Sequence, residues 1–235
     1  MKLGIFADPH WCGQDVLCKT RRPRLSLAKM QAASEAFAKA GVDLILCMGD
    51  LVDPEETHEA EIFHLKTAFT LFQSTEAPFL LVPGNHDYHV FGAGEMEELV
   101  GFRIPPYRID VGGVRLIILD ANYRSNGRRY DIAGVEWTDT NLPQEQLDFL
   151  QGALHTSSLP CVVAVHEVLD PTVRQDHVIR NAEAARSIIR KNGKVRLVLQ
   201  GHYHAGADSL INGIPYLTVP AMCEGTENHF LILDL

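Results

Sequence analysis

Short apolar runs recur along the chain, and longer segments with a helical spacing of apolar residues lie between most of them. Runs of this kind, rich in Val, Ile and Leu, are typical of buried strands. Strands that alternate with helices predict an α/β fold. The predicted strands are residues 2–7, 43–48, 79–82, 114–119, 161–165 and 195–200.

Four segments between these runs are predicted helices. In the first, apolar residues recur about every 3.6 positions and Gly41 follows as a C-terminal stop. Pro143 begins the third, because proline is tolerated in the first turn of a helix. The predicted helices are residues 25–40, 58–73, 143–154 and 181–191. The apolar face predicted for the first helix consists of Leu25, Leu27, Ala28, Ala32, Ala36, Phe37 and Ala40.

The C-terminal part of the chain is predicted to be extended. Asn212-Gly213 lies between two extended segments, and this dipeptide is a strong signal for a β-hairpin. A final strand follows within residues 228–235. Because the chain has 235 residues, 46% of them hydrophobic, and no internal repeat or linker, we expect one domain over residues 1–235.

Polar motifs follow five of the predicted strands directly. An apolar run closed by Gly or Asp and a polar side chain predicts a buried strand that presents functional residues at its C-terminal end. The motifs combine carboxylate, amide and imidazole groups, which are ligands of divalent cations, and an aspartate is short enough to bridge two ions. The five motifs are Asp8-Pro9-His10, Gly49-Asp50-Leu51-Val52-Asp53, Gly84-Asn85-His86-Asp87, His166 and Gly201-His202-Tyr203-His204.

Each motif taken alone has a simpler interpretation. An Asp-x-His sequence at a strand end is usually a turn with a solvated imidazole, and a His-x-His sequence usually lies on the surface. Their joint occurrence, each after an apolar run, favours a single metal site. The histidines outside the motifs are expected to be solvated or satisfied in the core, with His89 the nearest of them to a substrate. They are residues 58, 64, 89, 155, 177 and 229.

In order and wording, the five motifs resemble the signature of the calcineurin-like metallophosphoesterase superfamily, over residues 1 to about 220. The resemblance implies a four-layer α/β/β/α sandwich of two mixed β-sheets, with the metal site at the C-terminal ends of the strands. It also implies two divalent metal ions. Mn or Fe are the expected metals, and Zn or Mg are also compatible with the ligand set. By the same resemblance, one ion is held by Asp8, His10, Asp50 and His204, and the other by Asp50, Asn85, His166 and His202.

The resemblance assigns the two remaining polar residues of the motifs to catalysis. His86 is expected to face the scissile phosphate as a donor rather than to bind metal, and Asp53 to hold its other ring nitrogen and favour the charged ring. For Asp53 a structural alternative exists, because an aspartate before Pro54 could cap the helix near residue 58 or close the turn. Glu167 is expected either to orient His166 or to face solvent.

The function implied by the resemblance is a dinuclear metal-dependent phosphohydrolase that cleaves small phosphate esters or anhydrides by attack of a metal-bound hydroxide. The loop with Arg21-Arg22-x-Arg24 and the C-terminal segment resemble the manganese-dependent ADP-ribose/CDP-alcohol diphosphatase branch, which implies nucleoside-diphosphate-linked substrates. The alternative is a phosphodiesterase for cyclic nucleotides or glycerophosphodiesters. A catalytically silent metal-binding scaffold is a different class, but such proteins usually lack a ligand or the histidine of Gly-Asn-His, and all are present here.

Substrate contacts are predicted near the motifs. Arg21 and Arg22 belong to the only basic cluster close to a motif loop and are candidates for bidentate phosphate binding, although arginines before a helix are more often a solvated face. Tyr203 is the candidate for stacking on a base, with packing in the core or at the rim as an equal alternative. The same two interpretations apply to Trp11, Tyr88 and Tyr123.

Charge and composition limit the kinds of molecule that the protein is expected to bind. The net charge of −9 provides no basic surface for a polyanion, so long nucleic acid is an improbable partner and a small phosphorylated metabolite is the expected substrate. The N-terminal apolar stretch is too short for a signal or membrane segment. Five cysteines without a paired framework indicate a reducing compartment, and we expect a cytoplasmic protein with no membrane contact. The sequence predicts no particular oligomeric state.

Overall fold

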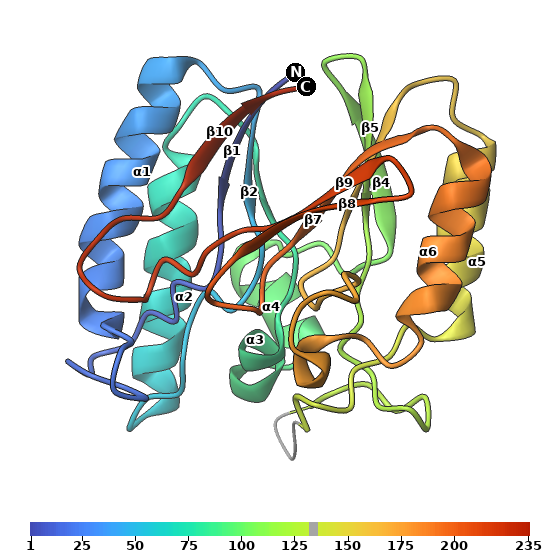
Figure 1. Cartoon of the computed structure of the whole chain (residues 1–235). Coiled ribbons are helices and arrows are strands. Elements are labelled where there is room, and N and C mark those ends of the chain that lie inside the picture. The colour runs from blue at the N-terminus through green and yellow to red at the C-terminus, as the bar shows by residue number, and fades with distance from the viewer. Residues whose placement is uncertain (132–135) are drawn as a thin grey trace.

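Two mixed β-sheets pack face to face at the centre of the computed structural model, which describes residues 1–131 and 136–235. Helices α1 (Ser26–Ala40) and α2 (His58–Gln73) cover the outer face of one sheet. Helices α5 (Gln144–His155) and α6 (Ala182–Asn192) cover the outer face of the other (Figure 1). The expected four-layer α/β/β/α sandwich with two mixed sheets is therefore confirmed.

The first sheet has four strands in the order β10-β1-β2-β3. β1, β2 and β3 are parallel, and β10 is antiparallel to β1. The first and last strands of the chain are thus neighbours, and the Met1 amino group donates a 2.9 Å hydrogen bond to the Leu235 carbonyl. The strands are β1 (Lys2–Phe6), β2 (Leu44–Cys47), β3 (Phe79–Leu81) and β10 (Leu231–Asp234).

The second sheet has six strands in the order β4-β5-β6-β7-β9-β8. The four central strands are parallel, and β4 and β8 are antiparallel edges that arise from two hairpins. One is the hairpin predicted at Asn212-Gly213. The strands are β4 (Tyr107–Val111), β5 (Val114–Ile118), β6 (Cys161–Ala164), β7 (Val195–Gln200), β8 (Ala207–Ile211) and β9 (Ile214–Thr218).

The alternation of side chains along each strand divides the apolar residues among three cores. In β1, Leu3 and Ile5 lie between the two sheets, whereas Phe6 faces α1 and α2. In β5, Leu116 enters the same inter-sheet core, and Ile117 faces α5 and α6. Because both faces of these strands are buried, their sequences are continuous apolar runs.

Three elements have no counterpart among the predicted ones: β4, α3 (Asn85–Val90) and α4 (Ala93–Val100). Two short 3-10 helices, η1 (Pro23–Leu25) and η2 (Gln175–His177), lie in loops. Among the described residues, no helix is both long and apolar enough to span a membrane. The N-cap of α2 is Thr57, whose side chain accepts from the Ala60 N–H, so the helix-capping alternative for Asp53 is wrong.

The buried face of α1 differs from the predicted one. Leu25 is 41% exposed, and Ala28 and Ala32 also face solvent. The buried face includes Lys29, whose ammonium donates to the carbonyls of Met222 (2.6 Å), Glu224 and Gly225. The prediction was wrong because a face defined by apolar residues leaves out polar side chains that are buried through hydrogen bonds to a distant loop. The buried residues are Ser26, Lys29, Met30, Ala33, Ser34 and Phe37.

Candidate metal centre

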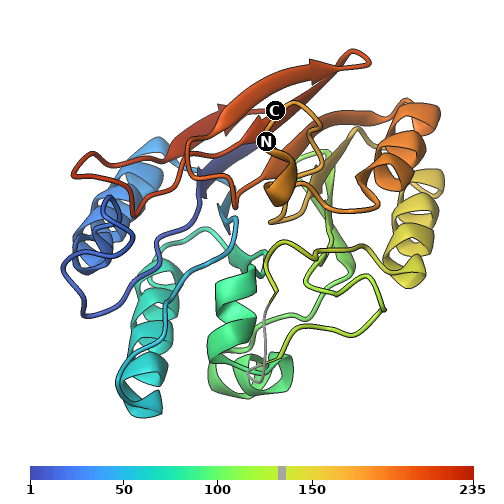
Figure 2. The same ribbon diagram turned by 60° about the horizontal axis from the view of Figure 1, so that its bottom comes forward.

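The loops at the C-terminal ends of the parallel strands meet at one edge of the sandwich, opposite the chain termini in Figure 1 and turned toward the viewer in Figure 2. The first sheet contributes the loops after β1, β2 and β3, and the second sheet those after β6 and β7. Backbone hydrogen bonds join neighbouring loops, such as Asp8 N–H to the Gly49 carbonyl (3.0 Å) and Gly201 N–H to the His166 carbonyl (2.9 Å). The seven predicted metal ligands all lie at this edge, six of them on these loops and Asn85 at the first residue of α3. They are Asp8, His10, Asp50, Asn85, His166, His202 and His204.

Asp50 lies between two groups of imidazoles. Its Oδ2 is 3.5 Å from His10 Nε2 and 3.4 Å from His166 Nε2. On one side, His10 Nε2 is 3.2 Å from His204 Nε2. On the other side, His166 and His202 have ligand atoms within 4.8 Å of each other and of a carboxylate oxygen of Asp50. One carboxylate is therefore placed to serve both groups.

Asp8 and Asn85 add oxygen atoms to these groups. Asp8 Oδ1 is 3.5 Å from His204 Nε2 and 3.8 Å from His10 Nε2, on the His10 side of Asp50. Asn85 is 4% exposed and lines the same cavity as His202. The seven predicted ligands are thus gathered at one centre, and their division between two ions stays a prediction.

Several buried atoms of this centre have no hydrogen-bond partner among the described residues. A buried polar atom without a partner costs about 1–3 kcal/mol. Four such atoms in one place fit a cation-binding site, because lone pairs turned inward are satisfied by metal ions. The donor set therefore fits two divalent ions. The four atoms are Asp8 Oδ1, Asn85 Oδ1, His166 Nε2 and His202 Nε2.

Three of the histidines are oriented by a hydrogen bond at the ring nitrogen that faces away from the centre. His10 Nδ1 donates to Asp53 Oδ1 (2.8 Å), and His166 Nδ1 donates to the Met48 carbonyl (2.5 Å). His204 Nδ1 donates to Glu224 Oε1 (2.8 Å). A donor at Nδ1 fixes the tautomer in which the Nε2 lone pair is available to a metal.

Three groups of the centre, Asp50, His10 and His202, have the ionisation state that a cation site requires. Burial would raise the pKa of Asp50, but His166, His86 and His10 hold it well below its usual range, so the group is ionised at neutral pH. Burial lowers the pKa of His10, and burial with the nearby His166 lowers that of His202. These two imidazoles are therefore neutral, as metal ligands must be.

The loops that carry the ligands are held in uncommon backbone conformations. Four of the predicted ligand residues have a positive φ, in the left-handed region that residues other than glycine rarely adopt. The φ values are 52° for Asp8, 46° for His10, 51° for Asp50 and 63° for His202. Such residues persist only where the surrounding structure fixes them, and they cluster at functional sites. Asp87 supplies part of this support, because it accepts from the N–H groups of Asp50 (2.9 Å), Leu51 (2.9 Å) and Gly84 (2.8 Å).

His86 lies beside the centre and lines its cavity. Its backbone N–H donates to Asp50 Oδ1 (2.8 Å), and its Nδ1 is 2.5 Å from Asp53 Oδ1. The same oxygen of Asp53 accepts the hydrogen bond from His10. Burial would lower the pKa of His86, but Asp50 and Asp53 raise it, so the protonated ring is favoured. His86 Nε2 is then the nitrogen left for a substrate.

The cavity at the centre has a volume of about 160 Å³. Arg21 lines it, as the sequence suggested, but Arg22 does not; its guanidinium donates to the carbonyls of Lys19 and Arg21 in its own loop. Tyr203 is not part of the lining and packs against His177 at 5.2 Å between ring centroids. The lining residues are Arg21, Asp50, Asn85, His86, Trp137, His177, His202 and His204.

Trp137 and His177 also line the cavity. The sequence did not point to Trp137, and it predicted that His177 would be solvated or in the core. Neither belongs to a motif, so no local signal could have identified them. The aromatic residues that the sequence did suggest are used elsewhere: Trp11 is buried against His64, and Tyr88 is buried with its hydroxyl on Asp120.

Tyr123, His89 and Glu167, which the sequence placed beside the motifs, do not line the cavity. The guanidinium carbon of Arg129 lies over the Tyr123 ring, 5.0 Å from the ring centroid, and Tyr123 does not line the cavity. His89 is exposed and does not line it either. Glu167 is fully buried, so the solvent-facing alternative is wrong, and burial raises its pKa to about 8.

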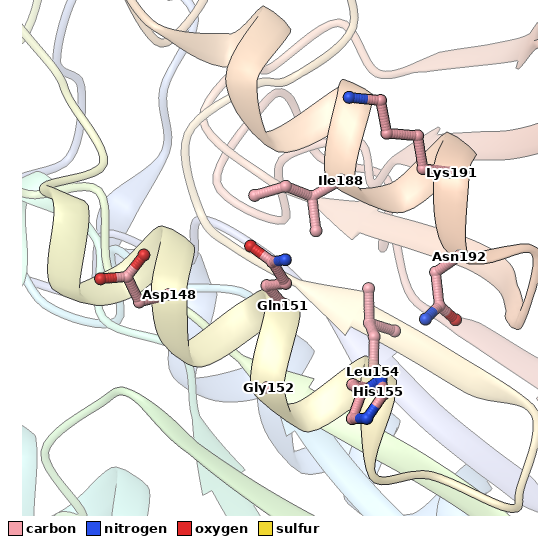
Figure 3. Close-up of a pocket in the computed structure, with 8 residues that line it drawn as sticks. All are labelled: Asp148, Gln151, Gly152, Leu154, His155, Ile188, Lys191 and Asn192. Atoms are coloured by element: carbon pink, nitrogen blue, oxygen red, sulfur yellow. The ribbon is translucent and has the colours of Figure 1, made fainter.

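A second hollow lies between α5 and α6, on the outer face of the six-stranded sheet (Figure 3). It has a volume of about 560 Å³ and is lined by aliphatic side chains such as Leu154 and Ile188 together with Asp148 and Lys191. None of the predicted ligands lies in it. The smaller cavity at the strand ends is the candidate active site.

The contact between Glu224 and His204 predicts a selective effect on one ion. We expect Glu224→Gln to weaken the binding of one of the two metal ions by roughly 10- to 100-fold, the usual cost of losing the partner of a metal-ligating histidine. Calorimetric titration with Mn²⁺ measures both affinities. Glu227→Gln is the matched control, because Glu227 is exposed. Unchanged affinity for both ions in Glu224→Gln would show that this carboxylate does not support a metal ligand.

Comparison with known proteins agrees with this geometry. The model of the calcineurin-like phosphoesterase family matches residues 1–206. The chain is 26% identical over 233 residues to the 3′,5′-cyclic adenosine monophosphate phosphodiesterase CpdA of Haemophilus influenzae, covering 95% of this chain and 77% of that protein. It is 24% identical over 218 residues to a probable cyclic nucleotide phosphodiesterase of Psychrobacter arcticus, covering 84% of this chain and 71% of that one.

Solved structures resemble the whole chain. A dimetal phosphatase from Danio rerio superposes with a TM-score of 0.84 and 17% identity, over 98% of this chain and 91% of that one. A protein of Thermus thermophilus superposes with a TM-score of 0.63 and 13% identity, over 99% and 93% of the two chains. At these identities the likeness shows a shared fold.

Proposed function

The chain belongs to the calcineurin-like phosphoesterase family and is a metal-dependent hydrolase of phosphate esters, and we propose that it cleaves small phosphate esters or anhydrides, with nucleoside-diphosphate-linked compounds as its substrates, at the centre described above. The family implies two divalent metal ions. We assign Mn or Fe to this site, since its mixture of imidazole and carboxylate ligands suits them, with Zn or Mg as weaker alternatives.

The position of Asp50 carries the proposal. Its Oδ2 is about equally far from His10 Nε2 and His166 Nε2, at 3.5 and 3.4 Å, so one oxygen reaches both groups of ligands. We assign Asp8, His10, Asp50 and His204 to one ion and Asp50, Asn85, His166 and His202 to the other. When bound, two such ions supply an activated water and neutralise charge on the phosphoryl oxygens.

The residues of the chain itself position the substrate and move a proton. Arg21 lines the cavity and is suited to bidentate binding of a phosphate group. His86, protonated through its contact with Asp53, donates a proton from Nε2 to the leaving oxygen. Asp53 also holds His10, so one carboxylate couples the acid to a metal ligand. Asp50, Asp53 and His10 are buried, which strengthens the electrostatic interactions among these groups.

A cyclic-nucleotide phosphodiesterase is the second candidate. It is favoured by the likeness to a protein named as a cyclic adenosine monophosphate phosphodiesterase, which extends over 95% of this chain. The net charge of −9 disfavours long nucleic acid as a substrate of either activity. The cytoplasmic location stays a prediction, consistent with five free cysteines.

A substrate screen tests the proposal. The Mn²⁺-loaded protein is incubated with mononucleotides, cyclic nucleotides, dinucleotide pyrophosphates and glycerophosphodiesters, and phosphate and nucleotide products are measured. We expect the highest kcat/KM for a nucleoside-linked pyrophosphate. Cleavage of a cyclic nucleotide above all others would favour the second candidate. No turnover of any of these compounds, or of bis(p-nitrophenyl) phosphate, with both ions bound would favour a catalytically silent scaffold.

The contact of Asp53 with His86 predicts a shift in the pH profile. The pKa of His86 is raised, against burial, by Asp50 and Asp53, so its acid form persists to higher pH. In Asp53→Asn the protonated ring loses a charged partner and its pKa falls. We therefore expect lower turnover and an alkaline limb of kcat that moves to lower pH. The amide oxygen of Asn can still accept from His10, so both ions stay bound at saturating Mn²⁺, at which the pH profile is measured.

The matched control for Asp53 is Asp110→Asn, because Asp110 is bound to Arg115 on the β4–β5 hairpin. Its pH profile should equal that of the unmodified protein. Full activity and an unmoved alkaline limb in Asp53→Asn would reduce Asp53 to a structural residue of its turn.

A further inference from the structure

Three side chains that line the cavity belong to none of the sequence motifs: Arg21, Trp137 and His177. Arg21 suits a phosphate group, but Trp137 does not. Its side chain is large and apolar, yet Trp137 is 38% exposed within a cavity lined mainly by polar residues. An exposed indole gives up the stabilisation that burial would provide, and beside a polar cavity it offers an aromatic face to a ligand.

Trp137 is part of an aromatic wall, which we define as Trp137, His177 and Tyr203. The Trp137 and His177 rings are 5.1 Å apart in an edge-to-face arrangement, and His177 and Tyr203 are 5.2 Å apart in the same arrangement. The wall continues to the predicted metal ligand His202, whose ring is 5.8 Å from Trp137 and 5.1 Å from His177. Asp176 fixes the His177 ring through a 2.8 Å contact at Nδ1.

The segment that carries Trp137 is attached to the body of the protein on both sides. The hydroxyl of Tyr130 donates to the carbonyl of Glu136. Asp139, two residues after Trp137, pairs with Arg180 at 2.6 Å. The indole is therefore presented by residues 136–139, which are held on both sides of Trp137, and a ligand that stacks on it does not have to order these residues first.

We propose that this aromatic wall binds the nucleobase of the substrate, with Trp137 as the stacking surface. The proposal rests on the proposed function, because the phosphate of the same molecule occupies the metal centre. An aromatic face beside a phosphate site suits a nucleotide, since every base has a π-face and stacking on an aromatic side chain contributes roughly 10- to 100-fold in affinity. A purine covers more of the indole than a pyrimidine and is the preferred base.

The binding test uses two ligands that differ only in the base, AMP and ribose 5-phosphate. Their affinities for the Mg²⁺-loaded protein are measured by calorimetry, for the unmodified chain and for Trp137→Leu and Trp137→Phe. We expect AMP to bind the unmodified protein roughly 10- to 100-fold more tightly than ribose 5-phosphate. The ratio should fall to within a few-fold in Trp137→Leu and remain mostly intact in Trp137→Phe.

A fluorescence measurement gives an independent result. The chain has two tryptophans, and the other, Trp11, is 5% exposed and packs on His64. AMP should quench the emission of the unmodified protein, ribose 5-phosphate should not, and AMP should have no effect in Trp137→Phe, where only Trp11 emits. This measurement decides the question even if Trp137→Leu does not fold.

The outcomes separate this proposal from the one on which it rests. If AMP and ribose 5-phosphate bind the unmodified protein equally, or if the preference for AMP survives in Trp137→Leu, the wall does not bind the base and the phosphohydrolase function is unaffected. If AMP still quenches the emission of Trp137→Phe, the quenching does not come from Trp137, and the wall again does not bind the base. If neither ligand binds the metal-loaded protein, both proposals are overturned.

Discussion

We expect Asp50→Asn to lose affinity for both metal ions and, with it, nearly all turnover. The reason is that Asp50 Oδ2 lies within 3.5 Å of imidazoles on both sides of the centre, so the negative charge of one residue serves two ions. The loss should exceed the roughly 10- to 100-fold that removing an outer partner of a ligand costs. Native mass spectrometry at increasing Mn²⁺ concentrations measures the occupancy of each site.

Asp8→Asn is the matched comparison for this variant. Asp8 Oδ1 lies near His204 and His10 at 3.5 and 3.8 Å and farther from His166, at 4.0 Å. This variant should weaken mainly one ion and leave the other bound. An Asp50→Asn protein that binds two ions as tightly as the unmodified protein would remove the basis for a bridging role.

We expect His86→Asn to keep both ions and to lower turnover roughly 10²- to 10⁴-fold, the scale of a positioned acid. His86 lines the cavity and its Nδ1 faces Asp53, which leaves Nε2 for the leaving group. The loss should be smaller for a p-nitrophenyl ester, because p-nitrophenolate leaves almost without protonation. Steady-state kinetics on a p-nitrophenyl and an alkyl ester of the same phosphate measure the difference.

His89→Asn is the control for His86, because His89 is on the same short helix but is exposed. Its activity should be unchanged. If His86→Asn lost the same factor on good and poor leaving groups, His86 would bind a phosphate oxygen and would not act as an acid.

The sequence predicted the strands that deliver the ligands because both of their faces are buried. Residues such as Leu116 and Ile117 enter cores on opposite sides of the sheet, which makes the strand a continuous apolar run with a sharp polar end. β4 was missed because it is an edge strand whose apolar and polar residues alternate, so it does not form a continuous apolar run. The Gly112-Gly113 turn that separates it from β5 was the available signal. The polar buried face of α1, with Lys29 on distant carbonyls, has no local signal.

In the site, too, residues that follow a buried strand could be predicted from the sequence, and residues on irregular loops could not. The seven predicted ligands follow strands, so their sequence positions carry the information, and the structure brings them together; their roles stay predictions. Glu224, Trp137 and His177 reach the site from loops with no regular pattern around them. Their contribution depends on contacts between segments distant in sequence, such as the bond from Glu224 to His204, and only a folded chain reveals it.

The central claim is that two metal ions share the carboxylate of Asp50. Electron paramagnetic resonance of the protein with two equivalents of Mn²⁺ tests it most directly, because ions linked by a common ligand are magnetically coupled. We predict the spectrum of a coupled pair at two equivalents, replaced in Asp50→Asn by signals of isolated Mn²⁺. A spectrum of isolated Mn²⁺ alone in the unmodified protein at two equivalents would contradict the dinuclear centre.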